Sequence, residues 1–110
     1  MNRLPPALAA AATARILERL GDPPGRVLEL GFAGIHAMPL RLAGFDVVVV
    51  EPHPAHRDRA RERAGDAPAA IPAEPFDAAI VPDGVDLEGI DARRLLVVGH
   101  DGAVWSSGSS

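Results

Sequence analysis

The sequence contains no cysteine and no lysine. Without cysteine, the chain has no disulfide framework, no thiolate ligand for a metal and no cysteine nucleophile. The absence of lysine accompanies a richness in alanine and proline that is typical of a GC-biased genome, and we draw no function from it. Disulfide scaffolds, thiolate metal sites and cysteine-dependent enzymes are therefore excluded.

Long apolar runs are also missing. No stretch approaches the roughly 20 apolar residues that a membrane span requires. The start of the chain, MNRLPPALAAAATARILERLG, has an apolar middle that is loosely similar to a secretory signal. Arg15, Glu18 and Arg19 interrupt this middle at helical spacing, which favours an amphipathic helix instead. We therefore expect a cytoplasmic protein that does not associate with membranes.

The bulk composition is that of an ordinary folded domain. Hydrophobic residues make up 47% of the 110 residues and charged residues 24%. This length is typical of one domain and too short for two. The net charge of −4 has the wrong sign for a partner held by its phosphate groups. We expect a single domain over residues 1–110 that does not bind nucleic acid.

Short apolar runs rich in branched residues alternate with helical patterns along the chain. Runs this continuous predict strands covered on both faces, as in a parallel sheet. The alternation predicts an α/β fold, a three-layer, Rossmann-like and mostly parallel sheet. The expected elements are a helix over 5–20 that Gly21 closes, strands over 27–30, 47–50, 78–81 and 95–98, and a helix over 53–64.

The C-terminal part has a different pattern. Asp101-Gly102 between two apolar runs predicts a hairpin, so the last strand returns antiparallel along the sheet edge. Trp105 on that strand packs against the sheet edge or a partner chain, which makes the edge a candidate surface for a homodimer or a partner protein. We divide the chain into an N-terminal helix (1–21), a cofactor-binding core (26–100), and an edge strand with a frayed tail (101–110).

Residues 26–51 predict a site for a nucleoside-bearing cofactor. Such a site needs a turn after the first strand where backbone approaches the ligand, a helix that begins nearby, and an acceptor for the ribose hydroxyls. Gly31 and Gly34 supply the turn. Glu51 follows the second strand, at the usual distance of about 20 residues from the first glycine.

These residues resemble the class I S-adenosylmethionine-dependent methyltransferase superfamily, over roughly residues 20 to 100. VLELG at 27–31 is similar to its first motif, in which Glu29 takes the place of the acid two positions before the first glycine. PFDAAIVPDG at 75–84 is similar to the family's fourth strand. The resemblance implies S-adenosylmethionine as the cofactor, with Glu51 as the ribose-binding acid. The residues that it places at the cofactor are Glu29, Gly31, Phe32, Gly34, Glu51 and Asp66.

The sequence departs from the family pattern in the glycine turn. Ala33 and Ile35 stand where the pattern has glycines, and Gly34 falls between them. Pro39 would lie inside a helix that began at Gly34 but suits one that begins near Met38, so we expect a longer loop and a shorter helix.

The stretch between Glu51 and the strand at 78–81 is also short for the family. It leaves little room for a third strand, which we expect to be stunted near 69–71 or missing. GDA at 65–67 resembles the family's third motif, which would place Asp66 at the adenine amino group. Alternatively, Gly65 ends the helix and Asp66 caps a turn. Glu74 is a weaker candidate for the adenine contact.

Four further polar residues have weaker claims. His53 and His56 have metal-ligand spacing beside Glu51, but histidines beside prolines at a helix start are commonly solvated, and we expect no metal. His36 in the glycine loop could contact a ligand or act as a base. Asp83 could contact substrate or form a turn with Gly84.

Three functions follow from these residues. The first is a minimal methyltransferase-like protein that binds S-adenosylmethionine or its demethylated product, with catalysis in doubt because little chain is left to build a substrate pocket. The second is a non-catalytic Rossmann-like interaction module with a degraded site. The third is a nicotinamide dinucleotide-binding domain, which Glu29 disfavours because such domains usually lack this acid.

Overall fold

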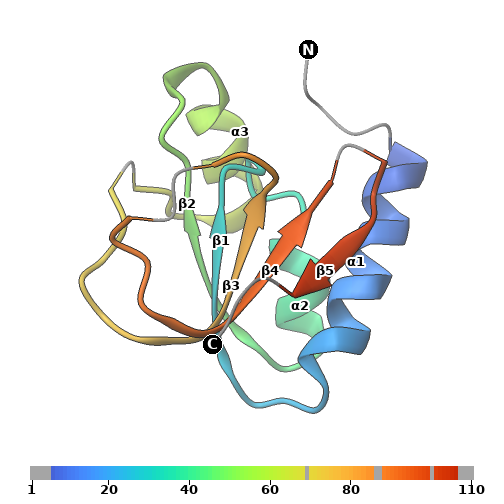
Figure 1. Cartoon of the computed structure of the whole chain (residues 1–110). Coiled ribbons are helices and arrows are strands. Elements are labelled where there is room, and N and C mark those ends of the chain that lie inside the picture. The colour runs from blue at the N-terminus through green and yellow to red at the C-terminus, as the bar shows by residue number, and fades with distance from the viewer. Residues whose placement is uncertain (1–5, 69, 86–87, 100, 107–110) are drawn as a thin grey trace.

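A computed structural model describes residues 6–68, 70–85, 88–99 and 101–106. Helices and strands alternate as far as the third strand, and the last three strands follow one another with no helix between them in the described residues (Figure 1). The elements are α1 (Pro6–Leu20), β1 (Arg26–Leu30), α2 (Ala37–Leu42), β2 (Asp46–Val50), α3 (Pro54–Ala64), β3 (Phe76–Pro82), β4 (Ala92–Val98) and β5 (Val104–Ser106).

The strands form one five-stranded sheet with the order β2-β1-β3-β4-β5. The first four strands are parallel, and β5 runs antiparallel to β4. The turn that leads into β5 is closed by a hydrogen bond from Gly99 N to Ala103 O at 2.8 Å. These features confirm the expected α/β class, the mostly parallel sheet and the C-terminal hairpin strand. The tail at 107–110, expected to fray, lies outside the described residues.

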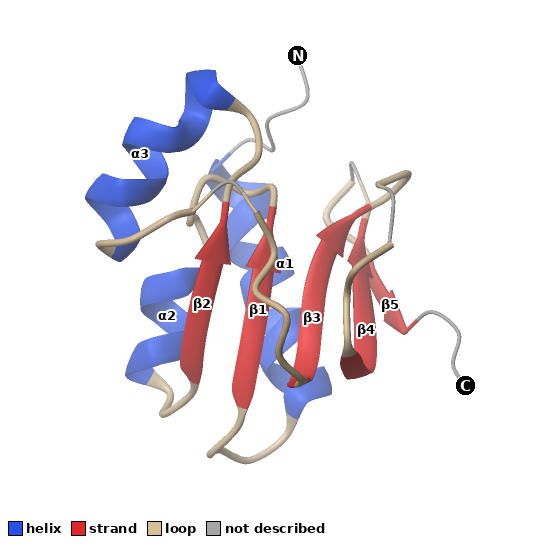
Figure 2. Cartoon of the chain, turned by 90° about the vertical axis from the view of Figure 1, so that its left-hand side faces the viewer, coloured by secondary structure: helices blue, strands red, loops and turns tan. Residues whose placement is uncertain are grey.

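The two faces of the sheet are covered differently. α1 and α2 lie against one face, where buried side chains such as Ile16 and Leu40 pack on Val27 and Val49. Loops cross the opposite face, where Ile71 and other loop residues cover the buried apolar side chains of the strands (Figure 2). The described residues place no helix over this second face, so the expected third layer is not confirmed.

The short connections follow from the sequence. α2 begins at Ala37, so Pro39 stands in its first turn, where a missing N–H leaves no helix hydrogen bond unmade. Between α3 and β3 the described residues contain no strand, and Glu51 N instead donates to Pro68 O at 2.9 Å. β2 is therefore an edge of the sheet. The longer glycine loop, the shorter helix and the lack of a full third strand all agree with the expectations.

In the part of the chain that the structure describes, no helix has the length and apolar character needed to cross a membrane.

Candidate functional site

The site predicted from the sequence lies where the strand order reverses. β1 pairs with β2 on one side and with β3 on the other. Ligands of such sheets bind at this switch point, outside the carboxyl ends of the strands. Gly31 directly follows β1 there, but a Cβ built on it would lie 3.5 Å from Cγ of Pro82, at the end of β3. The Pro82 ring therefore lies beside Gly31, which is itself exposed.

The loop after β1 turns through left-handed backbone. Gly31 has φ 81°, Ala33 φ 52° and Gly34 φ 74°. Ala33 is the one described residue other than glycine with positive φ, a conformation that costs a residue with a side chain about 1 to 2 kcal/mol. Two hydrogen bonds hold it: Ala33 N donates to Glu51 Oε1 at 2.8 Å, and Arg63 Nη1 donates to Ala33 O at 3.1 Å. The main chain at Ala33 is thus bound by protein groups on both sides.

Glu51 connects this loop to the start of α3. It is 2% exposed. Its Oε1 accepts from Ala33 N at 2.8 Å, and its Oε2 accepts from His53 N at 3.0 Å. Each carboxylate oxygen therefore already accepts a main-chain N–H, at the position where the resemblance implies contact with ribose hydroxyls.

Glu29 lies beneath the same loop. It is fully buried, and its Oε2 accepts from His36 N at 2.9 Å. Its Oε1 has no hydrogen-bond partner among the described residues. Burial raises the pKa of Glu29 from 4.5 to about 7, although the His36 N–H and the positive charges of Arg41 and Arg63 oppose the rise. Glu29 supports the loop backbone, and one of its oxygens is buried without a partner.

His36 belongs to a buried polar chain with Thr13 of α1. Thr13 Oγ1 donates to Ala9 O at 2.9 Å and lies 2.6 Å from Nδ1 of His36. A hydroxyl has a single proton, so Nδ1 of His36 is the donor in the second contact. Its Nε2 is then a buried acceptor with no partner in the described residues.

The surroundings of His36 keep its ring neutral. The ring is fully buried and contacts Phe32 edge to face at 5.0 Å between centroids. Burial lowers the pKa of His36 from 6.5 to about 4. A threonine on the buried, alanine-rich face of the first helix was the one signal in the sequence for this contact.

α3 covers the glycine loop from the carboxyl side. A Cβ on Gly34 would lie 3.4 Å from Ala60 O and 3.4 Å from Cβ of Arg63. Figure 2 shows α3 above the carboxyl end of β2, beside this loop. A glycine at position 34 is therefore explained by packing, because the lack of a side chain allows α3 to approach the loop closely.

The second group of predicted residues is divided between the end of α3 and the amino end of β1. Gly65 ends α3 with φ 92°, and its N donates to Arg61 O at 2.8 Å, as in the structural alternative for GDA. Asp66 is exposed beside it. Glu74 forms an ion pair with Arg26 at the amino end of β1, so it lies at the opposite end of that strand from Gly31.

Three other polar candidates lie on the surface. Asp83 is exposed in a turn beside Gly84, which has φ 87°. His53 caps α3 by accepting from Ala55 N at 3.1 Å, and its ring lies 4.7 Å from that of His56. Over the described ranges, no group of three or more His, Cys, Asp or Glu side chains converges on a possible metal position.

Several contacts of the loop in this conformation stand where the resemblance implies S-adenosylmethionine. Both acids are buried, Glu51 is engaged at both oxygens, and α3 packs on Gly34, whereas Gly31 is exposed. Two hollows lined by described residues lie elsewhere. One of about 470 Å³ lies between α1 and the β4–β5 hairpin, and one of about 70 Å³ lies near the amino end of β1.

The comparisons with known proteins add no family assignment, because no protein-family model and no curated protein matches this chain.

Proposed function

We propose that this chain is a non-catalytic, Rossmann-like interaction module of the cytoplasm, in which the acids of the cofactor motif have structural roles. The observation that carries the proposal is the state of Glu51. A carboxylate that is 2% exposed and accepts main-chain N–H groups at 2.8 and 3.0 Å holds the glycine loop and α3 in place. Ligand hydroxyls could reach it only if this arrangement opened.

The histidine of the loop is also poorly placed for acid–base chemistry. His36 was the candidate base, but it is fully buried and its pKa is lowered to about 4. A general base must reach the proton that it removes from a substrate. His36 instead contacts Thr13 and Phe32, both of which belong to the protein's own packing.

A second candidate function, binding of S-adenosylmethionine or S-adenosylhomocysteine, is favoured by one observation. Glu29 Oε1 lies buried beneath the switch-point loop without a partner. A cationic amino group would satisfy such an oxygen and keep the carboxyl group ionised. This function requires α3 to move away from Gly34, on which it now packs.

Calorimetry of the full chain separates the two functions. If the chain is an interaction module, we expect no binding heat with S-adenosylmethionine, S-adenosylhomocysteine or NAD at about 1 mM, the weak end of specific affinity. Saturable binding of the first two, weakened by about 1 to 3 kcal/mol in Glu51→Ala, would establish the second candidate and reject the first. Binding of NAD alone would favour a dinucleotide domain instead.

The structural role of Glu51 has its own test. Glu51→Ala removes the acceptor of two main-chain N–H groups, so we expect the free energy of unfolding to fall by about 3 kcal/mol. Glu62→Ala on the exposed side of α3 is the matched control, and it should change the free energy by no more than about 0.5 kcal/mol. Equal losses in the two variants would contradict a structural Glu51.

A further inference from the structure

The outer edge of β5 carries unused main-chain groups. β5 is the last strand in the sheet order, and Val98 lies opposite Val104 in its pairing with β4. The hydrogen bond from Gly99 N to Ala103 O makes these two residues a hydrogen-bonded pair of the antiparallel ladder. Hydrogen-bonded and non-hydrogen-bonded pairs alternate, so Val104 and Ser106 belong to non-hydrogen-bonded pairs. Their N–H and C=O groups therefore point away from β4. They have no partner in the described part of the chain, so this edge can take another strand.

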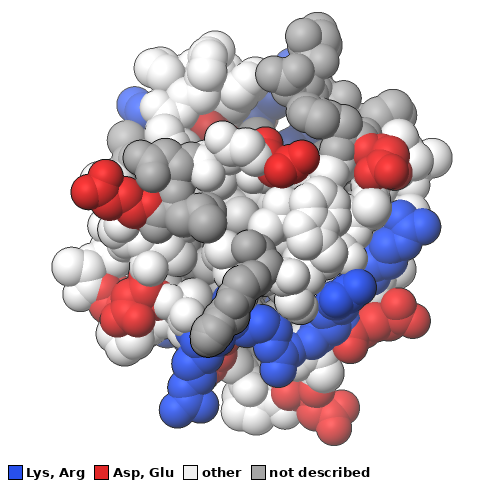
Figure 3. All heavy atoms as spheres, in the orientation of Figure 1, with Lys and Arg blue, Asp and Glu red and all other residues white. Residues whose placement is uncertain are grey.

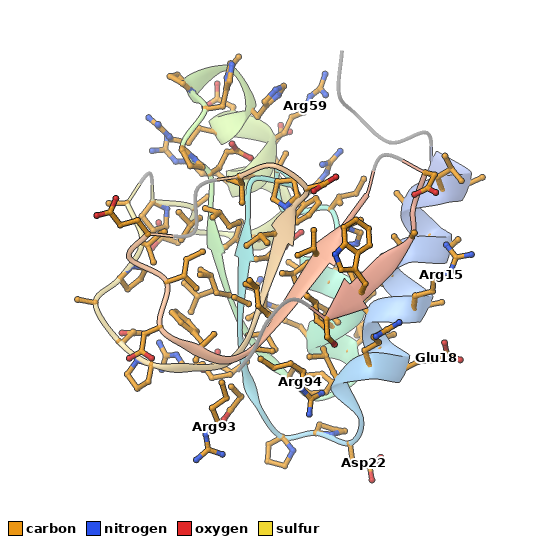
Figure 4. The ribbon with its side chains drawn as sticks, viewed as in Figure 1. Arg15, Glu18, Asp22, Arg59, Arg93 and Arg94 are labelled. Carbon is orange, nitrogen blue, oxygen red and sulfur yellow. The ribbon has the colours of Figure 1, made fainter. Side chains whose placement is uncertain are left out.

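Arginines flank this edge on the α1 side. Arg15 and Arg19 are four residues apart on α1, and Arg94 of β4 donates to Arg19 O. Figure 3 shows a diagonal row of blue side chains across this face, and Figure 4 labels Arg15 and Arg94 within it. All three arginines are exposed in a chain whose net charge is −4. The row is therefore a positively charged surface on a protein whose net charge is negative.

The row has donors to spare. Arg15 Nη1 donates to Gly102 O at 2.8 Å, which leaves the other guanidinium donors unused. Arg19 has no side-chain hydrogen bond or ion pair among the described residues. Two acids, Glu18 and Asp101, line the same hollow, but neither forms an ion pair with Arg15 or Arg19 among the described residues, and Asp101 Oδ1 accepts from Ala103 N at 3.0 Å.

The other side of the edge is apolar. Val104 is buried among the side chains that face α1, so Trp105 projects from the opposite face. Trp105 is 38% exposed, and its ring lies over Gly99, where a Cβ would be 3.1 Å away. A strand added to β5 would thus have arginines along one face and a tryptophan along the other.

We propose that the β5 edge binds an extended segment of a partner protein in which acidic and apolar residues alternate. Side chains of a strand alternate between faces, so the acids would meet Arg15, Arg19 and Arg94 while the apolar residues cover Trp105. Main-chain groups of Val104 and Ser106 supply the strand hydrogen bonds. This inference rests on the proposed interaction module and gives it a partner chemistry.

A second copy of the chain is a poor occupant. Antiparallel pairing of two β5 edges across a two-fold axis places the same face of both sheets on the same side. The arginine rows of the two copies would then face each other on that side, and like charges opposite one another are destabilising. Charge complementarity selects an acidic partner over a homodimer.

The test uses the full chain and a synthetic peptide of eight alternating glutamate and valine residues. Trp105 is the only tryptophan, so its emission reports on this edge directly. We expect saturable binding with a blue shift of that emission, and at least tenfold weaker binding for a lysine–valine peptide. We also expect at least tenfold weaker binding for a glutamate–valine peptide that is N-methylated on the bonding side of its backbone. No emission change up to about 1 mM peptide would overturn the proposal, as would equal binding of all three peptides.

Variants locate the site on the protein. Arg19→Glu reverses a charge that has no partner, and Ser106→Pro removes an outward N–H without touching the pairing with β4. Each should weaken peptide binding at least tenfold, whereas Arg59→Glu on α3, labelled far from β5 in Figure 4, should leave it unchanged. Equal effects of Arg19→Glu and Arg59→Glu would overturn the proposal, and so would a dimer in sedimentation equilibrium that Ser106→Pro abolishes. If the peptide does not bind the β5 edge, the proposed function is still decided separately, by the Glu51 variants and the cofactor calorimetry.

Discussion

Replacement of Glu29 by glutamine tests whether this buried acid is protonated in the folded protein. Its pKa is raised by burial from 4.5 to about 7. Below pH 4.5 the group is protonated in both the folded and the unfolded chain, so it contributes no pH dependence. As the pH rises, the unfolded chain releases this proton first, and folding is penalised up to a limit reached above pH 7. The full penalty is about 3 kcal/mol, because each pKa unit is worth about 1.4 kcal/mol.

His36 has the opposite effect. Its pKa is lowered by burial from 6.5 to about 4. As the pH falls below 6.5, the unfolded chain takes up a proton that the folded protein does not, so stability is lost until about pH 4. In the window from 4.5 to 6.5 the two slopes cancel, because the folded protein keeps the Glu29 proton while the unfolded chain carries the His36 proton. We expect the contribution of this pair to stability to be nearly flat there, to fall between about pH 6.5 and 7, and to level off above that.

Glu29→Gln keeps an oxygen that can accept from His36 N but cannot ionise. The free energy of unfolding of this variant, relative to the natural protein, should rise by about 3 kcal/mol between pH 4.5 and 8, whatever its constant offset. Urea unfolding followed by circular dichroism at pH 4.5, 6 and 8 measures the difference. Glu62→Gln, at an exposed position on α3, is the control and should show no such trend. A constant difference between Glu29→Gln and the natural protein across this range would refute a neutral, buried Glu29.

Two further predictions concern the packing around the loop. Thr13→Val leaves Nδ1–H of His36 buried without its acceptor, so the free energy of unfolding, measured by thermal unfolding, should fall by about 1 to 3 kcal/mol. Thr13→Ser keeps the hydroxyl and should recover most of this loss. Gly34→Ala should destabilise more than Gly65→Ala, because both glycines have positive φ but only Gly34 has Ala60 O within 3.4 Å of an added Cβ. The shared backbone cost is about 1 kcal/mol, and equal losses in denaturant unfolding would contradict close packing of α3 on the loop.

Much of the sheet could be predicted from the sequence, because its strands are continuous apolar runs. The run at 27–30 falls within β1 (Arg26–Leu30), and the run at 95–98 ends β4 (Ala92–Val98). The hairpin before β5 follows from Asp101-Gly102, since a turn there requires a residue with positive φ such as Gly102. The second helical layer was expected by analogy with doubly wound sheets. The loop segments over that face carry apolar residues without helical periodicity, so they cover it as coil.

The structural role of Glu51 could not be predicted from the sequence. A carboxylate after a strand has the same spacing in the sequence whether it binds ribose or main-chain N–H groups. What decides is the path of the loop, and this loop places Ala33 at φ 52° with its N–H directed at Glu51. The contact of Thr13 with His36 joins residues far apart in the chain and depends on how α1 lies over the sheet. No local pattern encodes that placement.

The shallow anchoring of α3 has a consequence for its dynamics. Ala60 is the one buried residue of this helix, Ala64 packs partly buried against the core, and polar contacts such as the 2.8 Å bond from Arg41 Nη1 to Ala64 O complete the attachment. Segments with few buried apolar contacts open at a lower free energy than the core, so amide hydrogens of α3 should exchange well before those of β1 and β3. Each such opening would uncover the glycine loop, and a ligand that needs the uncovered loop would have its affinity divided by the fraction of open molecules. The stability of this one helix therefore sets how accessible the switch point is to any ligand.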